Sequence, residues 1–186
     1  MSVEFSLKER LILMNQYDIM AKLTSDEYEK KSFENYSEIF RCGYEWGYGL
    51  VTEPLLEELS GQECKFVCNV LDMYSDLYYA REKDENIKAE VDAKDVIFKG
   101  FDLNDSVESK YYGFAKFLIE DLGRYREYRE LLESGVIESL NSHGFGPSAR
   151  KLVEMVEVYK KVKKRSRDRH DYNLNMEEVL EVLSVK

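Results

Sequence analysis

Apolar residues recur three or four positions apart along most of the chain, which is the spacing that places them on one face of a helix. The first such series is Leu7, Leu11, Met14, Tyr17 and Ala21. Ser6 and Glu9 stand at its start with the spacing of a capping box, in which each side chain accepts a hydrogen bond from the other residue's backbone N–H. The pattern therefore predicts a helix that starts just after Ser6.

The same signals predict most of the other helices. Capping pairs of this spacing precede four later series: Thr24 with Glu27, Ser60 with Glu63, Asp105 with Glu108, and Asn175 with Glu178. The apolar positions behind them are Phe33, Tyr36 and Phe40; Cys64, Val67, Leu71, Tyr74 and Tyr78; Tyr111, Phe114, Leu118 and Leu122; and Val179, Leu180 and Leu183. Leu152, Val156 and Tyr159 predict one more helix, from about Pro147.

Other stretches predict where helices stop. Gly43 should end one helix and Gly123 should interrupt another before it resumes over 125–132, because glycine tolerates the left-handed conformation. Thr52 and Pro54 suit the first turn of a short helix. Two further stretches do not read as regular helix: the charged residues 81–95 predict a solvated linker or frayed helix end, and residues 96–102 predict a short extended piece.

Together these elements predict an all-α fold. We expect an N-terminal helical hairpin over residues 1–50, packed with a larger multi-helix domain over 51–186, and at most one short extended segment near 96–101. The length of 186 residues suits one compact unit, and an apolar fraction of 44% provides a core without disulfides.

Composition also bears on location. No apolar stretch approaches the roughly 20 residues of a membrane span, and charged residues between Glu4 and Arg10 interrupt any secretion signal. Cys42, Cys64 and Cys68 are odd in number and lack the spacing of a disulfide framework. We therefore expect a cytoplasmic protein without membrane association.

The net charge of −10 is unevenly distributed. Residues 160–169, KKVKKRSRDR, contain seven basic groups and one acid, an excess of six, so the rest of the chain carries −16. The basic segment can attract a nucleic-acid phosphate backbone or the acidic body of the same protein.

Seven fragments, in this order, carry a resemblance to a known family. They are LILMNQYDIMAKL (11–23), Gly43-Tyr44, ECKFVCNVLDMYSDL (63–77), FKGFD (98–102), YYGFAKFLIEDLGRY (111–125), HGF (143–145) and, more faintly, LNMEEV (174–179). With them the chain resembles the bacterial YfbU family. The resemblance implies an all-helical fold and carries no established reaction, cofactor or catalytic residue. Residues 46–51 and 126–141 depart from the family pattern, so it implies no role for Trp46.

Catalytic and metal chemistry find little support in the sequence. Cys64 and Cys68 share a helix face, but without a CxxC pair or enough histidines they favour core packing over a zinc site. We predict no metal and no cofactor. His143 has the side chain of a general base, yet no nucleophile motif accompanies it, and a structural role in its loop is favoured. The loop HGFGPSAR (143–150) can hold an anion on the first amides of a helix or serve as an ordinary helix entry.

The basic segment offers two alternatives to a solvated helix end. Arg165 and His170 have the R-x4-H spacing of the pair that HEPN-type ribonucleases use, a spacing that arises easily in so basic a run. A weak nucleic-acid contact through 160–169 is the other alternative. Its candidate residues are Lys160, Lys161, Lys163, Lys164, Arg165, Arg167 and Arg169.

GYEWGYGL (43–50) combines three glycines with Tyr44, Trp46 and Tyr48. We interpret it as a helix-to-helix corner whose aromatic rings seal a core or a subunit interface, since such anchors are common in interfaces. Arg124, His143 and Phe145, which lie in the fragments of resemblance, are further binding or interface candidates. The sequence thus favours a homo-oligomeric helical interaction protein over an enzyme.

Overall fold

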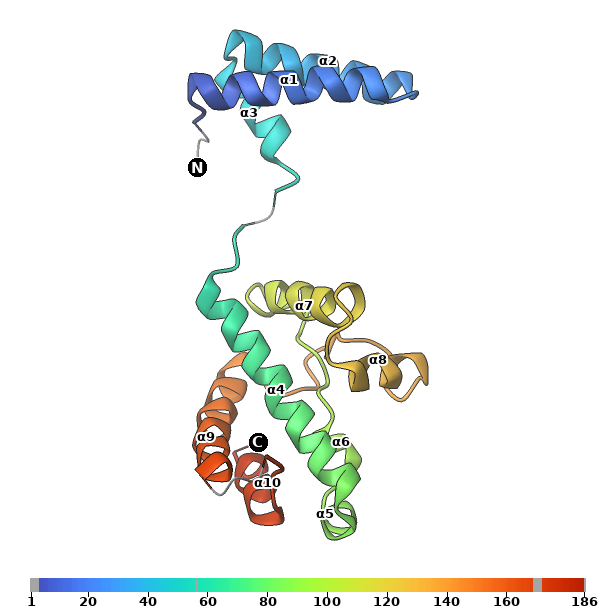
Figure 1. The fold of residues 1–186 in the computed structure, drawn as a ribbon, viewed down its shortest axis with the longest axis vertical. Coiled ribbons are helices and arrows are strands. Elements are labelled where there is room, and N and C mark those ends of the chain that lie inside the picture. Colours follow the sequence, from blue (N-terminus) through green and yellow to red (C-terminus); the bar gives the residue numbers. More distant parts are fainter. Residues whose placement is uncertain (1–3, 56, 169–171, 186) are drawn as a thin grey trace. The chain divides into compact units, whose positions relative to one another are not determined.

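The computed structural model describes residues 4–55, 57–168 and 172–185, and its regular elements in these ranges are helices (Figure 1). This described part contains no strand; extended backbone pairs there only in a parallel bridge between Phe101 and Asn141. The predicted all-α fold and its short extended segment are therefore confirmed.

The chain forms two compact units, Met1–Glu58 (unit 1) and Leu59–Lys186 (unit 2). Unit 1 contains α1 (Leu7–Leu23), α2 (Glu27–Cys42) and α3 (Glu45–Thr52). Unit 2 contains α4 (Gly61–Lys83), α5 (Glu85–Glu90), α6 (Ala93–Val96), α7 (Glu108–Lys116), the π-helix η1 (Phe117–Asp121), α8 (Arg126–Glu133), α9 (Ala149–Asp168) and α10 (Met176–Leu183).

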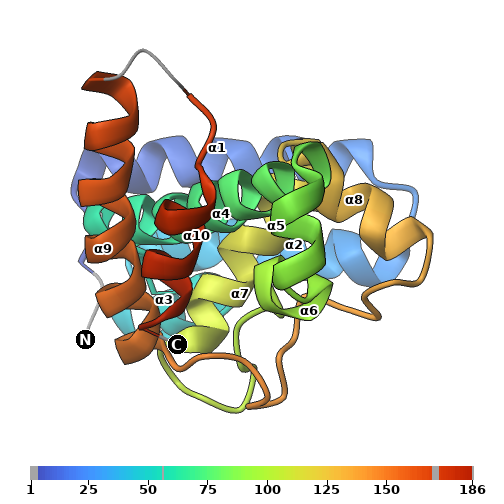
Figure 2. The ribbon, with the colours of Figure 1, turned by 90° about the horizontal axis from the view of Figure 1, so that it is seen from below.

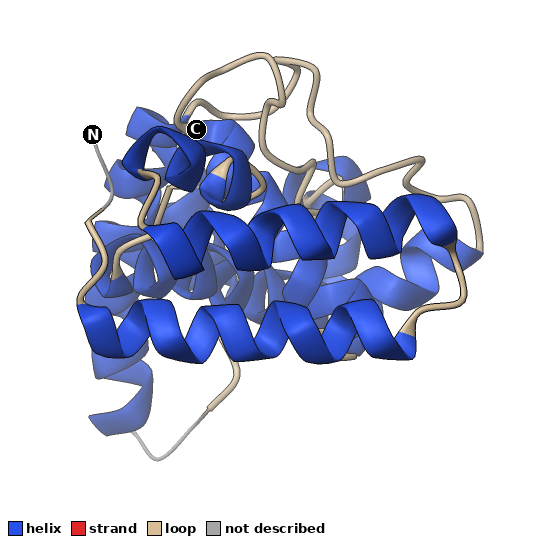
Figure 3. Ribbon diagram, turned by 90° about the horizontal axis from the view of Figure 1, so that it is seen from above, coloured by secondary structure: helices blue, strands red, loops and turns tan. Residues whose placement is uncertain are grey.

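In unit 1, α1 and α2 form an antiparallel hairpin (Figure 3). The capping box of α1 is confirmed, since the Ser6 N–H donates to the Glu9 carboxylate at 2.8 Å. The predicted N-cap of α2 was wrong, because Asp26, not Thr24, accepts hydrogen bonds from the first amides of the helix. Thr24 instead donates its hydroxyl to the Glu29 carboxylate at 2.7 Å and accepts the Asp26 N–H at 3.2 Å, an amide that precedes the helix.

The hairpin core is a small aromatic cluster. Phe40, which is 1% exposed, stacks on Tyr17 and Tyr48 with ring centroids 5.9 and 5.6 Å apart. Arg10 donates to the backbone oxygen of Phe40 at 2.9 Å and so satisfies a carbonyl near the end of α2. Gly43 ends α2 with φ +71°, as its predicted role requires.

The segment after Gly43 differs from the predicted corner. Only Gly43 and Tyr44 make the turn, and Glu45–Thr52 is helix α3, so the predicted helix start at Thr52 was wrong. Gly47 explains the close packing, because a Cβ there would lie 2.8 Å from Ile39 Cδ1 on α2. Glycine serves here to bring two helices together rather than to keep the backbone irregular.

In unit 2, α4 is the central helix, and α5, α6, α7 and α9 pack against it (Figure 1). Its buried face is Val67, Val70, Leu71, Met73, Tyr74, Leu77 and Ala80. Its capping box, Ser60 with Glu63, is confirmed. α10 lies beside α9 (Figure 2), and its capping box, Asn175 with Glu178, is confirmed as well.

The charged stretch 81–95 is not a solvated linker, and this prediction was wrong. It completes α4 and forms α5 and part of α6, with Ile87 fully buried and Val91 5% exposed. Arg81 donates to the Val91 backbone oxygen at 2.8 Å and holds the stretch against α4. Ile87 and Val91 are four positions apart, but a single pair at helical spacing among so many charges is a weak signal, and the burial of both residues depends on tertiary packing.

The long helix predicted from Asp105 to Leu122 is modified at its end. After α7 the chain widens into η1, where the Leu122 N–H donates to the Phe117 oxygen at 2.9 Å. Gly123 then interrupts the helix with φ +63°, as predicted, and α8 resumes at Arg126.

Candidate functional sites

Two adjoining pockets lie between α4 and α9. The first, of about 240 Å³, is lined by Phe66, Val153 and Val156 together with polar side chains. The lining of the second, of about 260 Å³, includes Asn69, Asp72, Lys160, Lys163, Lys164 and Arg167. Asn69 and Lys160 belong to both, so the pockets form one continuous depression. We call it the α4–α9 groove, with an apolar pocket and a basic pocket.

Helical spacing on α9 produces the basic pocket. Its four cations, Lys160, Lys163, Lys164 and Arg167, lie three or four residues apart or adjacent, and so occupy one face of the helix. Arg165 is directed elsewhere and forms an ion pair with Glu181 of α10. Lys161 lines neither pocket. The basic segment is thus divided between different sides of α9.

Two of the proposed basic residues cannot be placed. Arg169 and His170 lie outside the described residues. The Arg165–His170 pair therefore stays a prediction from the sequence. The ion pair with Glu181 gives Arg165 a structural role in holding α10 to α9.

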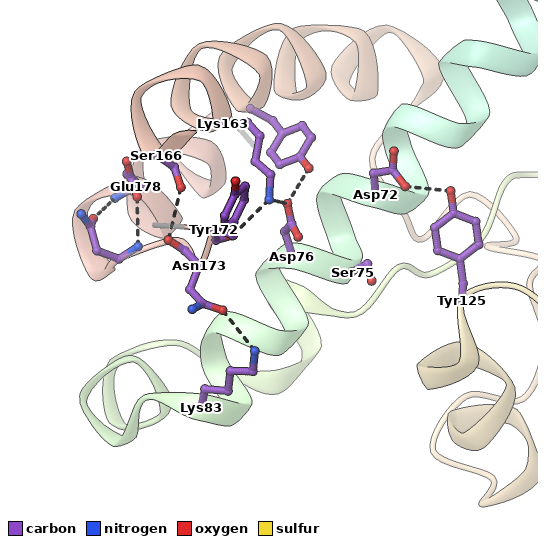
Figure 4. A network of polar contacts seen from close by, with 12 residues as sticks. Asp72, Ser75, Asp76, Lys83, Tyr125, Lys163, Ser166, Tyr172, Asn173 and Glu178 are labelled. Atoms are coloured by element: carbon purple, nitrogen blue, oxygen red, sulfur yellow. Dashed lines mark hydrogen bonds and ion pairs between the residues drawn. The ribbon is translucent and has the colours of Figure 1, made fainter. Parts of the chain in front are cut away.

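One wall of the groove is fixed by a polar network around Asp76. Its carboxylate accepts hydrogen bonds from the Tyr159 hydroxyl, at 2.6 Å, and from the Lys163 ammonium (Figure 4). Lys163 also donates to the Tyr172 backbone oxygen at 3.2 Å. The Asp76 and Lys163 side chains are 29% and 18% exposed, so this ion pair is better shielded from water than most surface pairs. It joins α4, α9 and the segment before α10.

The tyrosines of unit 2 predict a loss of stability at alkaline pH. Burial, with the Asp76 hydrogen bond, raises the pKa of Tyr159, and burial with the Asp72 hydrogen bond raises that of Tyr125. Since both folded pKa values exceed the unfolded value of about 10, their stabilisation is present below pH ~10 and is lost as the pH rises through the folded values. Urea unfolding at a series of pH values should show this fall. Tyr159→Phe should reduce its slope, and an unchanged slope would contradict the assignment.

Arg124 and Tyr125 line a third pocket of about 380 Å³ with Cys68, Leu118 and Asp72, the last of which also lines the basic pocket. Tyr125 has a left-handed backbone, φ +53°, and donates its hydroxyl to Asp72 at 2.8 Å. Burial, followed by the nearby Asp72 carboxylate, raises the pKa of the Cys68 thiol. A thiol that stays protonated is a poor nucleophile, so the pocket does not resemble a cysteine active site.

The loop with His143 is held by its own polar contacts. The His143 N–H donates to the Asn141 side-chain oxygen at 3.1 Å, and the two side chains meet at 3.3 Å through Asn141 Nδ2 and His143 Nδ1. His143 is exposed and has φ +48°, while Phe145 is 83% exposed. These contacts support the structural interpretation of His143 and leave Phe145 as free apolar surface.

The start of α9, the helix that follows this loop, is capped by a carboxylate of the protein itself. Glu108, which is 7% exposed, accepts a hydrogen bond from the Ala149 N–H at 2.7 Å and from the Asp102 N–H at 2.9 Å. Its carboxylate therefore occupies the first amide of α9. The alternative of an external anion in the HGFGPSAR loop gives way to an internal cap.

The three aromatic candidates of unit 1 have different environments. Trp46 is 86% exposed and Tyr44 is 55% exposed, whereas Tyr48 is 4% exposed and packs on Phe5 and Phe40. Tyr48 thus belongs to the core of unit 1 and presents no surface to a partner. Trp46 and Tyr44 do present such a surface.

Several groove residues were missed because nothing in α4 marks them as functional. Lys65, Phe66 and Asn69 looked like ordinary helix-surface positions. The four cations of α9 are among the residues predicted from the sequence, and a helical wheel of residues 153–167 groups them on one face with Val153 and Val156. The described residues contain no group of three or more His, Cys, Asp or Glu side chains placed to hold a metal ion.

Comparisons with known proteins agree with the fragments of resemblance. A family model described as the YfbU domain matches residues 3–185. The chain is also 30% identical over 177 residues to UPF0304 protein MJECS11 of Methanocaldococcus jannaschii, covering 95% of this chain and 96% of the relative. Across the described ranges, none of the helices combines the length and apolar character needed to span a bilayer.

Proposed function

The chain belongs to the YfbU family, and we propose that it is a non-catalytic helical interaction protein that self-associates through unit 1. The observation that carries this proposal is the balance of apolar residues in that unit. Only Ala21, Phe40 and Tyr48 are buried among its described apolar residues. Those left exposed are Leu7, Leu11, Ile12, Ile19, Met20, Leu23, Tyr28, Tyr44, Trp46, Leu50 and Leu55. Apolar surface of this extent marks an interaction site.

Helix α1 has apolar residues on two faces. Tyr17 and Ala21 point toward α2, while Ile12, Ile19 and Leu23 recur at spacings of seven and four on another face. Ile19 is 55% exposed and Leu23 is 79% exposed. A helix that is apolar beyond its packed face is typical of one buried on both sides.

A second copy of the chain is the partner that this surface fits best. An isologous dimer would place the same apolar stripe of α1 on both sides of a twofold axis, with no charge complementarity required. Trp46 and Tyr44 would extend the contact with aromatic anchors of the kind enriched at interface centres. The free cysteines Cys42, Cys64 and Cys68 support placing this assembly in a reducing cytoplasm.

The test is the oligomeric state of the full chain. We expect light scattering at micromolar concentration to give a dimer or a larger oligomer, and Ile12→Glu with Ile19→Glu to give a monomer. Two carboxylates added on α2, at the half-buried Ser32 (Ser32→Glu) and the exposed Asn35 (Asn35→Glu), are the matched control and should leave the assembly unchanged. A monomeric parent protein, or a double variant that assembles like the parent, would overturn the proposal.

Trp46→Ala should weaken association by about 2 kcal/mol or more, close to 30-fold in dissociation constant, if Trp46 is an anchor. The measurement is sedimentation equilibrium over a dilution series. Tyr28→Ala removes an aromatic ring that is 83% exposed at the start of α2, far along the hairpin from α3, and it should change association much less. Equal effects of the two variants would show that Trp46 has no special role.

A further inference from the structure

The basic pocket of the α4–α9 groove contains two cations that form no ion pair with the residues that the structure describes. Lys160 donates to Glu157 at 2.8 Å, and Lys163 pairs with Asp76. Lys164 and Arg167 form no ion pair within the described part of the chain. They lie three residues apart on the face of α9 that lines the pocket. An ammonium and a guanidinium so placed can both donate to the oxygens of one phosphate.

The charge of the groove is opposite to that of the molecule. Five cationic side chains line the two pockets: Lys65, Lys160, Lys163, Lys164 and Arg167. Three acidic side chains accompany them: Asp72, Glu157 and Asp168. Asp76, whose carboxylate pairs with Lys163 in one wall of the groove, is a fourth acid, so one positive charge remains in excess on a chain with a net charge of −10. This local excess favours an anionic group.

The adjoining apolar pocket can hold a ring. Phe66 is half-buried, and its own ring is steadied by Tyr111 with centroids 5.4 Å apart. Val156 is buried and Val153 is 49% exposed beside it.

From this arrangement we infer that the groove binds a nucleoside monophosphate, with its phosphate between Lys164 and Arg167 and its base against Phe66 and Val153. Asn69 and Lys160, which belong to both pockets, stand where the sugar would lie. The site is in unit 2 and is independent of the self-association proposed for unit 1.

A small ligand fits this groove better than a nucleic-acid strand does. The attraction comes from Lys164 and Arg167, which form no ion pair across the described ranges, and so acts on one phosphate. Every further phosphate of a strand would leave the groove and meet a surface whose charge is negative on balance, since residues outside 160–169 sum to −16. The repulsion therefore grows with strand length, whereas the attraction does not.

Isothermal titration of the full chain with AMP, GMP, CMP and UMP tests the inference, with adenosine and inorganic phosphate as half-ligands. We expect saturable binding of at least one monophosphate, and weaker binding of adenosine and of phosphate by about tenfold or more. The double variant Lys164→Gln with Arg167→Gln should weaken the binding of the monophosphate by about tenfold or more. Lys161→Gln, which removes a cation of α9 outside the groove, should change it by less than about twofold.

Three results would overturn the inference. One is the absence of saturable binding by all four monophosphates. Another is full affinity in the Lys164 and Arg167 double variant, or equal affinity for adenosine and AMP, because the phosphate would then make no contribution. The third is binding of a single-stranded oligonucleotide that is tighter than the binding of the monophosphates, with a salt dependence between about 50 and 200 mM that indicates contact with more than two phosphates. The groove would then be a nucleic-acid surface.

Discussion

Gly100→Ala should destabilise unit 2 by about 4 kcal/mol or more, enough to unfold it in a protein of ordinary stability. Gly100 has φ +95°, and a Cβ there would lie 1.8 Å from the Leu140 backbone oxygen. That oxygen accepts the Phe101 N–H at 3.0 Å, and Ser142 donates to the Phe101 oxygen at 3.0 Å. The methyl group can be accommodated only if this pairing of the two loops separates.

The measurement is urea unfolding followed by circular dichroism. Gly113→Ala is the matched control, because Gly113 is in α7 and a Cβ there would meet nothing within 4 Å. We expect it to be neutral or to stabilise by about 0.5–1 kcal/mol, since alanine is the better helix former. Equal stability of the Gly100 and Gly113 variants would refute the steric argument.

Glu108→Ala should lower the free energy of unfolding of unit 2 by about 3–5 kcal/mol, the second largest effect that we expect. The buried carboxylate receives one N–H from the loop at Asp102 and one from the start of α9 at Ala149. Without it both amides lose their partner in a site that water scarcely reaches, at about 1–3 kcal/mol for each unsatisfied group. Glu108→Gln should cost less, roughly 2 kcal/mol, because its amide retains one acceptor oxygen.

Glu120→Ala is the control for Glu108. Its carboxylate is exposed and forms an ion pair with Lys116 at 3.8 Å, an arrangement worth about 0–1 kcal/mol. Thermal unfolding of the variants side by side measures the difference. If Glu108→Ala proved no more harmful than Glu120→Ala, the buried carboxylate would not be the cap of α9.

The helices themselves could be predicted because their signals are local. Ser60 and Glu63 satisfy each other's amides across three residues, and Gly43 ends α2 by its own conformation. Such interactions need no other part of the chain, so they can be recognised in the sequence. Errors arose where a tertiary contact overrode the local preference, as when the packing of Gly47 against Ile39 extended α3 through the segment predicted as a corner.

The candidate sites could be predicted only in part. The sequence identified the cations of α9 but treated them as one run, because linear order does not show which side of a helix is lined by a neighbour. The structure directs Lys164 and Arg167 to the groove and Arg165 to Glu181. It likewise separates Trp46, at the surface, from Tyr48, in the core, although only one residue lies between them.

By itself, the sequence determined the helical class, most helix starts and stops, the family resemblance and the location of the basic residues. Tertiary structure alone decided which polar groups are buried and which apolar groups are not. Asp76 meets Lys163 across 87 positions and Glu108 meets Ala149 across 41, distances at which the pattern of either helix contains no trace of its partner. The sequence pattern predicts that a charged residue is exposed to solvent, unless a partner far along the chain forms a hydrogen bond with it. Only the folded chain supplies that partner.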